Sequence, residues 1–192
     1  MAPRITPGTR SQTGPVNAAI ARVIGLGGGT QGPPGLFTTL GRHRRLFRPW
    51  LRFASRLMPG GKLPRRDAEL VILRVAALCD CPYEWGHHER IAPRFGLDKQ
   101  AIERVRDGAA ADGWTARQHA ILTAVDELHA ERTLADGTWD SLGNAGLTET
   151  ELIELPMLVG HYEMLAMTLN ALRVEPDRFR GSGALGLLRR RS

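Results

Sequence analysis

Apolar residues recur at helical spacing along most of this chain, and this pattern constrains its fold more than any other feature. From residue 36 onward, large apolar side chains fall three and four positions apart, as in Phe47, Trp50, Leu51 and Ala54. An α-helix has 3.6 residues per turn, so this spacing places them on one helix face. Convincing runs of alternating β-branched residues, which would indicate strands, do not occur in the sequence. The sequence therefore predicts an all-α protein.

Helix boundaries can be placed within this pattern. Thr115 predicts the N-cap of a long amphipathic helix over residues 116–131, and Thr148 opens a capping-box pattern for the next helix. Pro156 predicts a break or restart of that helix, because proline lacks the N–H that the helix needs. We expect residues 134–146 to form a loop.

Composition divides the chain into three parts. Residues 1–35 are rich in Gly, Pro, Ser and Thr, a composition that predicts a flexible arm. Within this arm, residues 17–24 could form a short helix. We expect one helical domain over residues 36–177. Residues 178–192 are expected to form a basic tail rich in Gly and Arg. A chain of 192 residues is long enough for one such domain with its own core.

The positive charge lies at the two ends of the chain. The net charge is +6, yet residues 1–50 hold seven Arg and no acid, and residues 178–192 hold five Arg and no acid. The central part therefore carries +6 − 7 − 5 = −6. A nucleic-acid-binding domain would carry its positive charge on the folded surface, so we expect no nucleic-acid partner.

Location can also be predicted from the sequence. Since no run approaches 18 apolar residues and the first residues lack the apolar region of a signal peptide, we expect neither a membrane span nor secretion. The two cysteines, Cys79 and Cys81, are one residue apart and cannot form a secreted disulfide framework. The sequence therefore predicts a protein of the reducing cytoplasm.

The stretch from Cys79 to Ala92 concentrates reactive side chains. Pro82 suits the first turn of a helix, so Cys81 stands at the helix start, with Glu84 and His88 inside it. Their offsets of three and seven place a thiol, a carboxylate and an imidazole on one face. Such a set is what acid–base or thiol chemistry needs.

A metal site in this stretch is not predicted. Cys79, Cys81 and His88 lack a fourth ligand and the usual zinc spacing, so we expect no metal there. His87 lies about 100° round the helix from His88 and is predicted to be exposed.

The sequence resembles the carboxymuconolactone decarboxylase family, within the alkylhydroperoxidase D-like superfamily. The residues that carry the resemblance are Leu63-Pro-x-Arg, Glu69, Leu-Arg-Val-Ala, and Cys-Pro-Tyr-Glu-Trp-x-x-His88-x-x-x-Ala92, followed by Trp139, Gly146-Leu-Thr-Glu and Leu-Val-Gly160-His-Tyr-Glu-Met-Leu-Ala166. The likeness covers roughly residues 36–177. It implies an all-helical fold that forms homo-oligomers (dimers, trimers or hexamers), with active sites near subunit interfaces.

The peroxidase branch of the superfamily is similar but carries Cys-x-x-Cys-x-x-x-His, with a glutamate twelve residues before the first cysteine. Glu69, Cys81 and His88 fall on the matching positions, whereas Glu84 replaces the second cysteine. A dithiol cycle needs two sulfurs within reach of each other, so this route lacks its usual partner thiol.

The decarboxylase branch implies an enzyme that needs no metal or organic cofactor and acts on a small carboxylate or lactone. His88 and Glu84 would then be the acid and base, and Glu69 would orient the imidazole or relay protons. Burial among apolar side chains would raise the pKa of the carboxylic acid and make it a usable acid near neutrality. Arg74 could hold a substrate carboxylate. Further side chains that could line the site are those of Tyr83, Trp85 and His161.

Two other functions stay open at this point. Cys81, with Cys79, could support a peroxiredoxin-like thiol activity. Alternatively, the chain could be a non-catalytic helical oligomer that binds a protein partner through residues 1–35 and its Arg-rich ends. In that case Glu69 would be a surface carboxylate, Cys81 a buried apolar residue, and the neighbouring aromatic residues ordinary core.

Overall fold

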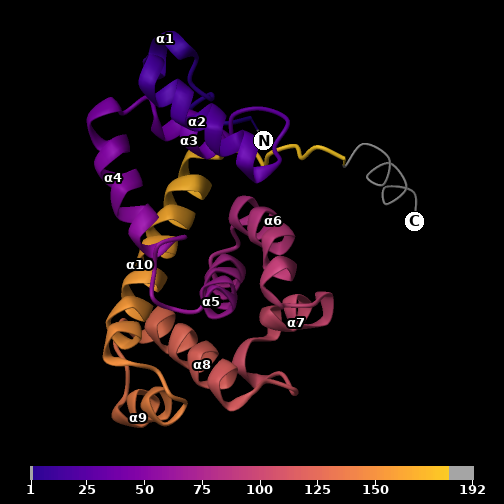
Figure 1. Ribbon diagram of the computed structural model, residues 1–192, viewed down its shortest axis with the longest axis vertical. Coiled ribbons are helices and arrows are strands. Elements are labelled where there is room, and N and C mark those ends of the chain that lie inside the picture. Colours follow the sequence, from indigo (N-terminus) through magenta and orange to yellow (C-terminus); the bar gives the residue numbers. More distant parts are fainter. Residues whose placement is uncertain (1, 182–192) are drawn as a thin grey trace. The chain divides into compact units, whose positions relative to one another are not determined.

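The computed structural model describes residues 2–181 and is all-α over that range (Figure 1). Within it, β-structure is limited to one isolated bridge between Thr30 and Phe179. The helices are α1 (Arg10–Thr13), α2 (Pro15–Gly28), α3 (Gly35–Leu40), α4 (Arg44–Leu57), α5 (Arg65–Leu78), α6 (Pro82–Ile91), α7 (Lys99–Arg104), α8 (Ala116–Glu131), α9 (Asp136–Asn144) and α10 (Glu149–Leu172), with 3₁₀ segments at Ala92–Phe95 and Val105–Ala110. The predicted fold class is confirmed.

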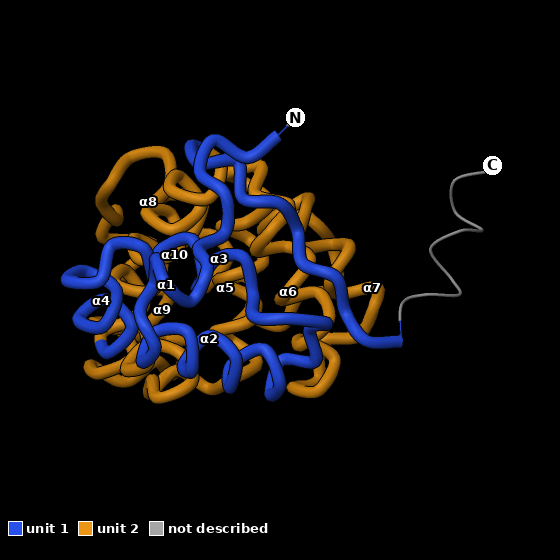
Figure 2. Tube along the Cα trace, turned by 90° about the horizontal axis from the view of Figure 1, so that it is seen from above, with its two compact units in different colours: residues 1–52, 171–192 blue, residues 53–170 orange. Residues whose placement is uncertain are grey.

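The chain divides into two compact units, which Figure 2 distinguishes by colour. One unit comprises residues 1–52 and 171–192, and the other comprises residues 53–170. The candidate site lies wholly in the second unit. The predicted domain limits at residues 36 and 177 stay a prediction. None of the helices within residues 2–181 has the length and apolar character needed to cross a bilayer.

The segment predicted as an arm is largely helical. Helix α2 begins with Pro15 at its first turn and ends at Gly29, whose φ of 72° is the left-handed conformation that glycine adopts without strain. It is longer than the short helix expected over residues 17–24. Asn17 is buried and donates from Nδ2 to the carbonyl of Gly41 at 3.3 Å, which ties this helix to the turn after α3. The part of the predicted basic tail from residue 182 onward lies outside the described residues.

Helix α5 is the centre of the second unit. It packs against α6 on one side and α8 on another, and every residue from Asp67 to Leu73 is buried. A helix enclosed in this way must be apolar nearly all round, which explains the Leu-Val-Ile-Leu run in its sequence. Each fully buried aliphatic side chain contributes about 1.5–3 kcal/mol relative to exposure. The fully buried large side chains of this unit are Leu70, Ile72, Leu73, Leu97, Ile121, Leu122, Leu142, Leu155, Leu158 and Leu169.

The predicted N-cap at Thr115 and the predicted capping box at Thr148 are both present. Thr115 precedes α8, its Oγ1 accepts from the N–H of Gln118 at 3.2 Å, and the helix runs over residues 116–131 as predicted. At the start of α10, the N–H of Thr148 donates to Glu151 at 2.7 Å. Glu151 also accepts from Arg117 at 2.8 Å, so the second cap is joined to α8.

Two predictions about local structure were wrong. Residues 134–146 were predicted as a loop, but Asp136–Asn144 within them form helix α9, because Leu142 is fully buried and its packing favours the helix despite the glycines of the segment. Helix α10 also continues through Pro156 without ending. The fully buried Leu155 and Leu158 flank the proline, and their packing outweighs the one backbone hydrogen bond that proline cannot make.

Candidate functional site

A tight turn between α5 and α6 positions the reactive residues. Cys79 caps α5, Asp80 has a φ of 46°, and Cys81 is the N-cap of α6 with Pro82 at the first helical position. The helix start predicted at Cys81 is therefore confirmed. Asn170 of α10 donates from Nδ2 to the carbonyl oxygens of Cys79 at 2.8 Å and Asp80 at 3.4 Å, which fixes this turn against α10.

Glu69 and His88 are joined directly. Glu69 on α5 has none of its surface exposed, and its Oε2 lies 2.7 Å from Nδ1 of His88 on α6. Its other oxygen accepts from Nε of Arg65 at 3.0 Å. A carboxylate can only accept hydrogen bonds, so beside the ionised Glu69 that pairs with Arg65 the donor is Nδ1 of His88, and Nε2 is the ring nitrogen left for other partners. Glu69 is thus a buried partner of the imidazole and not a surface carboxylate.

Tyr162 of α10 completes the surroundings of the imidazole. Its ring meets that of His88 edge to face, with centroids 5.4 Å apart and planes at 85°. Burial, reinforced by the carboxylates of Glu69 and Glu84, holds the pKa of Tyr162 well above its usual range, so its phenol keeps its proton. Tyr162 was not predicted as a site residue, because only the packing of α10 brings it to α6. Arg65 was also missed, although its spacing of four from Glu69 is a readable signal.

Glu84 is buried without the support that Glu69 receives. It is 3% exposed, and neither of its carboxylate oxygens has a nitrogen or oxygen partner among the described residues. Burial raises the pKa of Glu84 to about 8, and the hydrogen-bonding thiol of Cys81 lowers it only in part. At neutral pH this side chain is therefore mainly a neutral acid that can release a proton.

Both cysteines are free thiols that keep their protons at neutral pH. Burial raises the pKa of Cys81 to about 12, and the nearby carboxylate of Glu84 adds to the effect. Burial, together with Glu163 and Glu84, raises the pKa of Cys79 to about 11. Reactive cysteines have lowered pKa values, so neither thiol has the electrostatic surroundings of a thiolate nucleophile.

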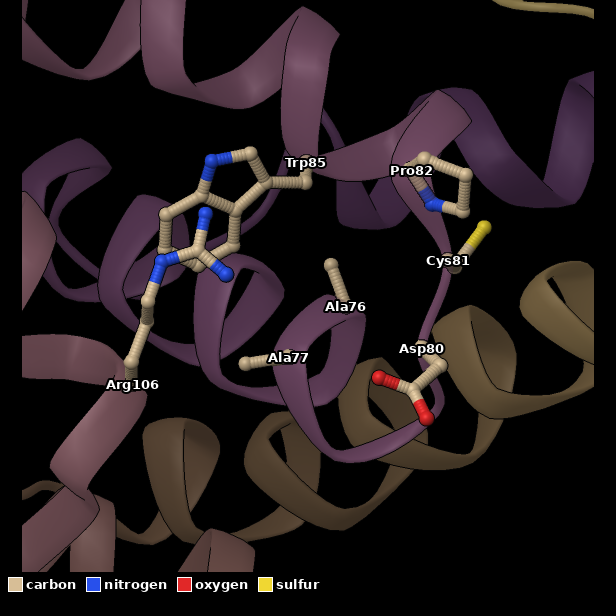
Figure 3. A pocket seen from close by; sticks show the side chains of 7 residues that line it. All are labelled: Ala76, Ala77, Asp80, Cys81, Pro82, Trp85 and Arg106. Atoms are coloured by element: carbon tan, nitrogen blue, oxygen red, sulfur yellow. The ribbon is translucent and has the colours of Figure 1, made fainter.

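A pocket of about 220 Å³ reaches the cluster at Cys81 (Figure 3). Figure 3 shows the guanidinium of Arg106 lying over the indole of Trp85 on one side, with Cys81 and Asp80 on the other. The guanidinium carbon is 3.6 Å from the ring centroid of Trp85, which is a close cation–π contact. The pocket is lined by Ala76, Ala77, Asp80, Cys81, Pro82, Trp85 and Arg106. Trp85 was predicted to line the site; Arg106 was not, because it comes from the distant 3₁₀ segment.

The structure gives Arg74 a different role from the one expected. Its guanidinium is bound to the carboxylate of Asp126 and to the carbonyl oxygens of Val105 and Arg106, so it joins α5 to α8 and to the 3₁₀ segment. Its side chain is only 12% exposed. These contacts, made through Nε and Nη1, hold the guanidinium within the packing between α5, α8 and the 3₁₀ segment, and we therefore withdraw that assignment.

Two further residues that were predicted to line the site, Tyr83 and His161, make ring contacts with other aromatic side chains. Tyr83 is buried and stacks on His87, with ring centroids 4.8 Å apart, which leaves His87 half-buried rather than exposed. His161 is buried between Phe53 and Tyr162, at centroid distances of 5.5 and 5.3 Å. Burial lowers the pKa of His161, so its ring is neutral at neutral pH and packs edge to face against the ring of Tyr162.

Comparison with known proteins places these residues within a family segment. Residues 44–127, which include Glu69, Cys81, Glu84 and His88, match the model of the Carboxymuconolactone decarboxylase family. No curated protein sequence matches the chain.

Several solved structures have a similar fold. An uncharacterized peroxidase-related protein from Ralstonia eutropha, described as an alkylhydroperoxidase AhpD core, has a TM-score of 0.80 at 16% identity and covers 91% of this chain and 92% of its own. A peroxidase-related protein from a Silicibacter species has a TM-score of 0.78 at 14% identity, over 92% of this chain and 94% of its own. The debrominase Bmp8, as a cysteine-to-alanine variant in complex with 2,3,4-tribromopyrrole, has a TM-score of 0.73 at 16% identity. The match covers 91% of this chain and 92% of the debrominase chain. At these identities the likeness concerns the fold alone.

Proposed function

We propose that this chain, whose residues 44–127 match the model of the Carboxymuconolactone decarboxylase family, is an acid–base enzyme acting on a small carboxylate or lactone, with decarboxylation as the reaction. The observation that carries this proposal is the buried Glu84, whose pKa of about 8 makes it an acid at neutral pH, one helical turn before His88. Side chains alone supply the chemistry, without a metal or organic cofactor.

His88 is the proposed base. The hydrogen bond from its Nδ1 to Glu69 fixes the ring orientation and the tautomer, so that Nε2 is the atom that accepts a proton. Arg65 holds the other oxygen of Glu69 and thereby keeps the carboxylate in place. Glu69 and Arg65 are thus positioning residues, while His88 and Glu84 handle the proton.

The proposed reaction conserves atoms and charge. The bond between the substrate carbon and its carboxylate breaks, CO₂ leaves, and the electron pair moves into the conjugated carbonyl of the lactone. Glu84 then delivers its proton to the substrate, and His88 returns a proton from solvent to Glu84. Positioned acids and bases of this kind contribute about 10²–10⁴-fold to a rate.

The pocket beside Cys81 is the proposed place of the substrate. It holds about 220 Å³, which suits a small metabolite. Arg106 supplies a cation at the wall, and its planar guanidinium can pair with a substrate carboxylate through two hydrogen bonds. The indole of Trp85 beneath it holds the guanidinium in place through the cation–π contact. Arg106 thus takes the role that Arg74 does not fill.

Substitution of the two proton-transfer residues tests the proposal. Small carboxylates and lactones would first be screened by CO₂ release and by thermal shift of the full chain. With a substrate in hand, we expect Glu84→Gln and His88→Gln each to lower kcat by about 10²–10⁴-fold, because each removes one proton-transfer group.

Glu89→Gln is the matched control, since Glu89 lies on the exposed face of the same helix. It should leave kcat within about twofold. Circular dichroism must show the same helical content in all variants. If Glu84→Gln and His88→Gln turn over at the rate of the unsubstituted chain, the acid–base assignment is wrong.

A thiol peroxidase is the second candidate, because Cys81 lines the pocket and the similar structures include peroxidase-related proteins. In such a reaction the Cys81 thiolate attacks the peroxide, the O–O bond breaks, and the sulfenate is reduced by an added dithiol. The raised pKa of Cys81, about 12, opposes this first step.

Peroxide consumption separates the two candidates. We expect the chain to consume hydrogen peroxide with dithiothreitol no faster than a Cys81→Ser variant, and mass spectrometry to find no Cys81 sulfenate or Cys79–Cys81 disulfide. Rapid consumption that disappears in Cys81→Ser would favour the peroxidase instead.

A further inference from the structure

Cys79, His129 and Glu163 form a second cluster of reactive side chains in the unit of residues 53–170. One potential ligand atom from each, a sulfur, a ring nitrogen and a carboxylate oxygen, lies within 4.8 Å of the other two. The residues come from three separate elements: the end of α5, the last turn of α8 and the middle of α10. We propose that this cluster binds one zinc ion, with water as the fourth ligand.

The donor set fits zinc better than it fits Mg²⁺ or Ca²⁺. Zinc takes thiolate, imidazole and carboxylate ligands in a tetrahedral arrangement, whereas Mg²⁺ and Ca²⁺ require oxygen ligands only. Zinc bonds of about 2.3 Å to sulfur and 2.0–2.1 Å to nitrogen and oxygen place neighbouring ligand atoms about 3.3–3.6 Å apart. Nδ1 of His129 and Oε1 of Glu163 are hydrogen-bonded at 2.7 Å, so zinc would enter between them by replacing the shared proton and separating these two atoms by about 0.6 Å. The three ligand atoms lie within 4.8 Å of one another, so small side-chain movements are enough to bring them to zinc-binding distances.

Neighbouring groups hold two of the three ligands in place. Nη1 of Arg132 lies 2.6 Å from Oε2 of Glu163, which leaves Oε1 as the oxygen that faces the cluster. Asn170 fixes the backbone of Cys79 through the hydrogen bond to its carbonyl. Hydrogen-bonded partners of this kind orient metal ligands and raise affinity about 10–100-fold.

Partial exposure gives the ion a route of entry and room for a water ligand. The side chain of His129 is 32% exposed and that of Glu163 is 14% exposed, while Cys79 is half-buried. On binding, the thiol of Cys79 releases its proton to solvent. The thiolate and the carboxylate then balance the charge of Zn²⁺.

The cluster shares no residue with the proposed acid–base site. Tyr162 contacts His88, whereas the next residue, Glu163, contacts His129. A failure of the zinc proposal would therefore leave the proposed function untouched, and the reverse is also true.

Cobalt titration of the full chain tests the proposal. After treatment with a chelator, Co²⁺ alone is added and the near-ultraviolet charge-transfer band of a cobalt–thiolate bond is followed, and Zn²⁺ is then added to displace it. We expect a saturable band at one Co²⁺ per chain that zinc removes. Cys79→Ser should abolish the band, and His129→Ala should weaken Co²⁺ binding at least tenfold.

Cys81→Ser is the matched control, because it removes the other thiol but lies outside the cluster. It should keep the band, and circular dichroism must confirm that each variant is folded. The proposal is overturned if the unsubstituted chain gives no thiolate band at millimolar Co²⁺, or if Cys79→Ser retains it.

Discussion

Glu69 and Glu84 are both buried glutamates, yet their surroundings give them opposite roles. Glu69 accepts hydrogen bonds from Arg65 and His88, so its carboxylate is satisfied and orients the imidazole. Glu84 has the weak thiol donor of Cys81 as its one hydrogen-bonding partner among the described residues, and burial therefore keeps its proton bound at neutral pH. Two carboxyl groups with such different environments are typical of a site that separates positioning from proton transfer.

The pKa of Glu84 predicts how activity depends on pH. The active form of this acid is protonated, so kcat should fall about tenfold per pH unit once the pH exceeds the pKa of about 8. A pH–rate profile measures this, and the residual activity of Glu84→Gln should lack the alkaline decline.

The opposite slope would contradict this prediction. A mechanism that uses the Cys81 thiolate would become faster as the pH rises toward the pKa of that thiol, about 12. A rate that increases through pH 8 would therefore exclude Glu84 as the acid and favour thiol chemistry.

The sequence predicted those site residues whose relation is set by local spacing. Glu84 and His88 are one turn apart on one helix, and Glu69 could be placed because the family pattern fixes its distance from Cys81. Arg106 and Tyr162 could not be predicted, because only the packing of distant elements brings them close. Arg74 was misassigned because its partner Asp126 lies 52 residues further along the chain, and only tertiary packing brings the two together.

At the scale of elements, the N-cap of α8 offers a direct test of how local signals determine helix ends. Thr115→Ala removes the oxygen that accepts from the N–H of Gln118, and caps of this type contribute about 0.5–2 kcal/mol. We expect the free energy of unfolding in urea to fall by about 1 kcal/mol, with an unchanged dependence on urea concentration.

Thr123→Ala provides the control on the same helix. Thr123 donates its hydroxyl to the carbonyl of His119 within the helix, and alanine favours helix formation more than threonine. The variant should be as stable as the unsubstituted chain or slightly more so. Equal destabilisation by both substitutions would show that the cap contributes nothing specific.

Elements were predictable where a local signal was strong and unopposed. Helix α8 has a capping box and a regular apolar face, and its limits agree with the prediction at both ends. Helix α9 and the passage of α10 through Pro156 were missed, because buried leucines there override the local preferences of glycine and proline. Such an override depends on tertiary contacts that a single sequence does not reveal.

At the scale of the whole molecule, the fold class was predictable because helical periodicity runs through most of the chain. Self-association, binding of a protein partner by the chain ends and cytoplasmic location stay predictions. Exposed large apolar residues of α10 repeat at intervals of three, four and seven, which places them on one helix face. They are Ile153, Met157, Met164 and Met167.

Helix α10 has a consequence for how substitutions in it should be interpreted. Tyr162 meets the imidazole of the acid–base cluster, and Glu163 belongs to the cluster around Cys79. Consecutive side chains on one rigid helix rotate together by the same angle. A rotation of α10 about its axis would therefore move Tyr162 relative to His88 and Glu163 relative to Cys79 at the same time. A loss of turnover caused by a substitution in this helix therefore identifies neither cluster until metal affinity has been measured in the same variant.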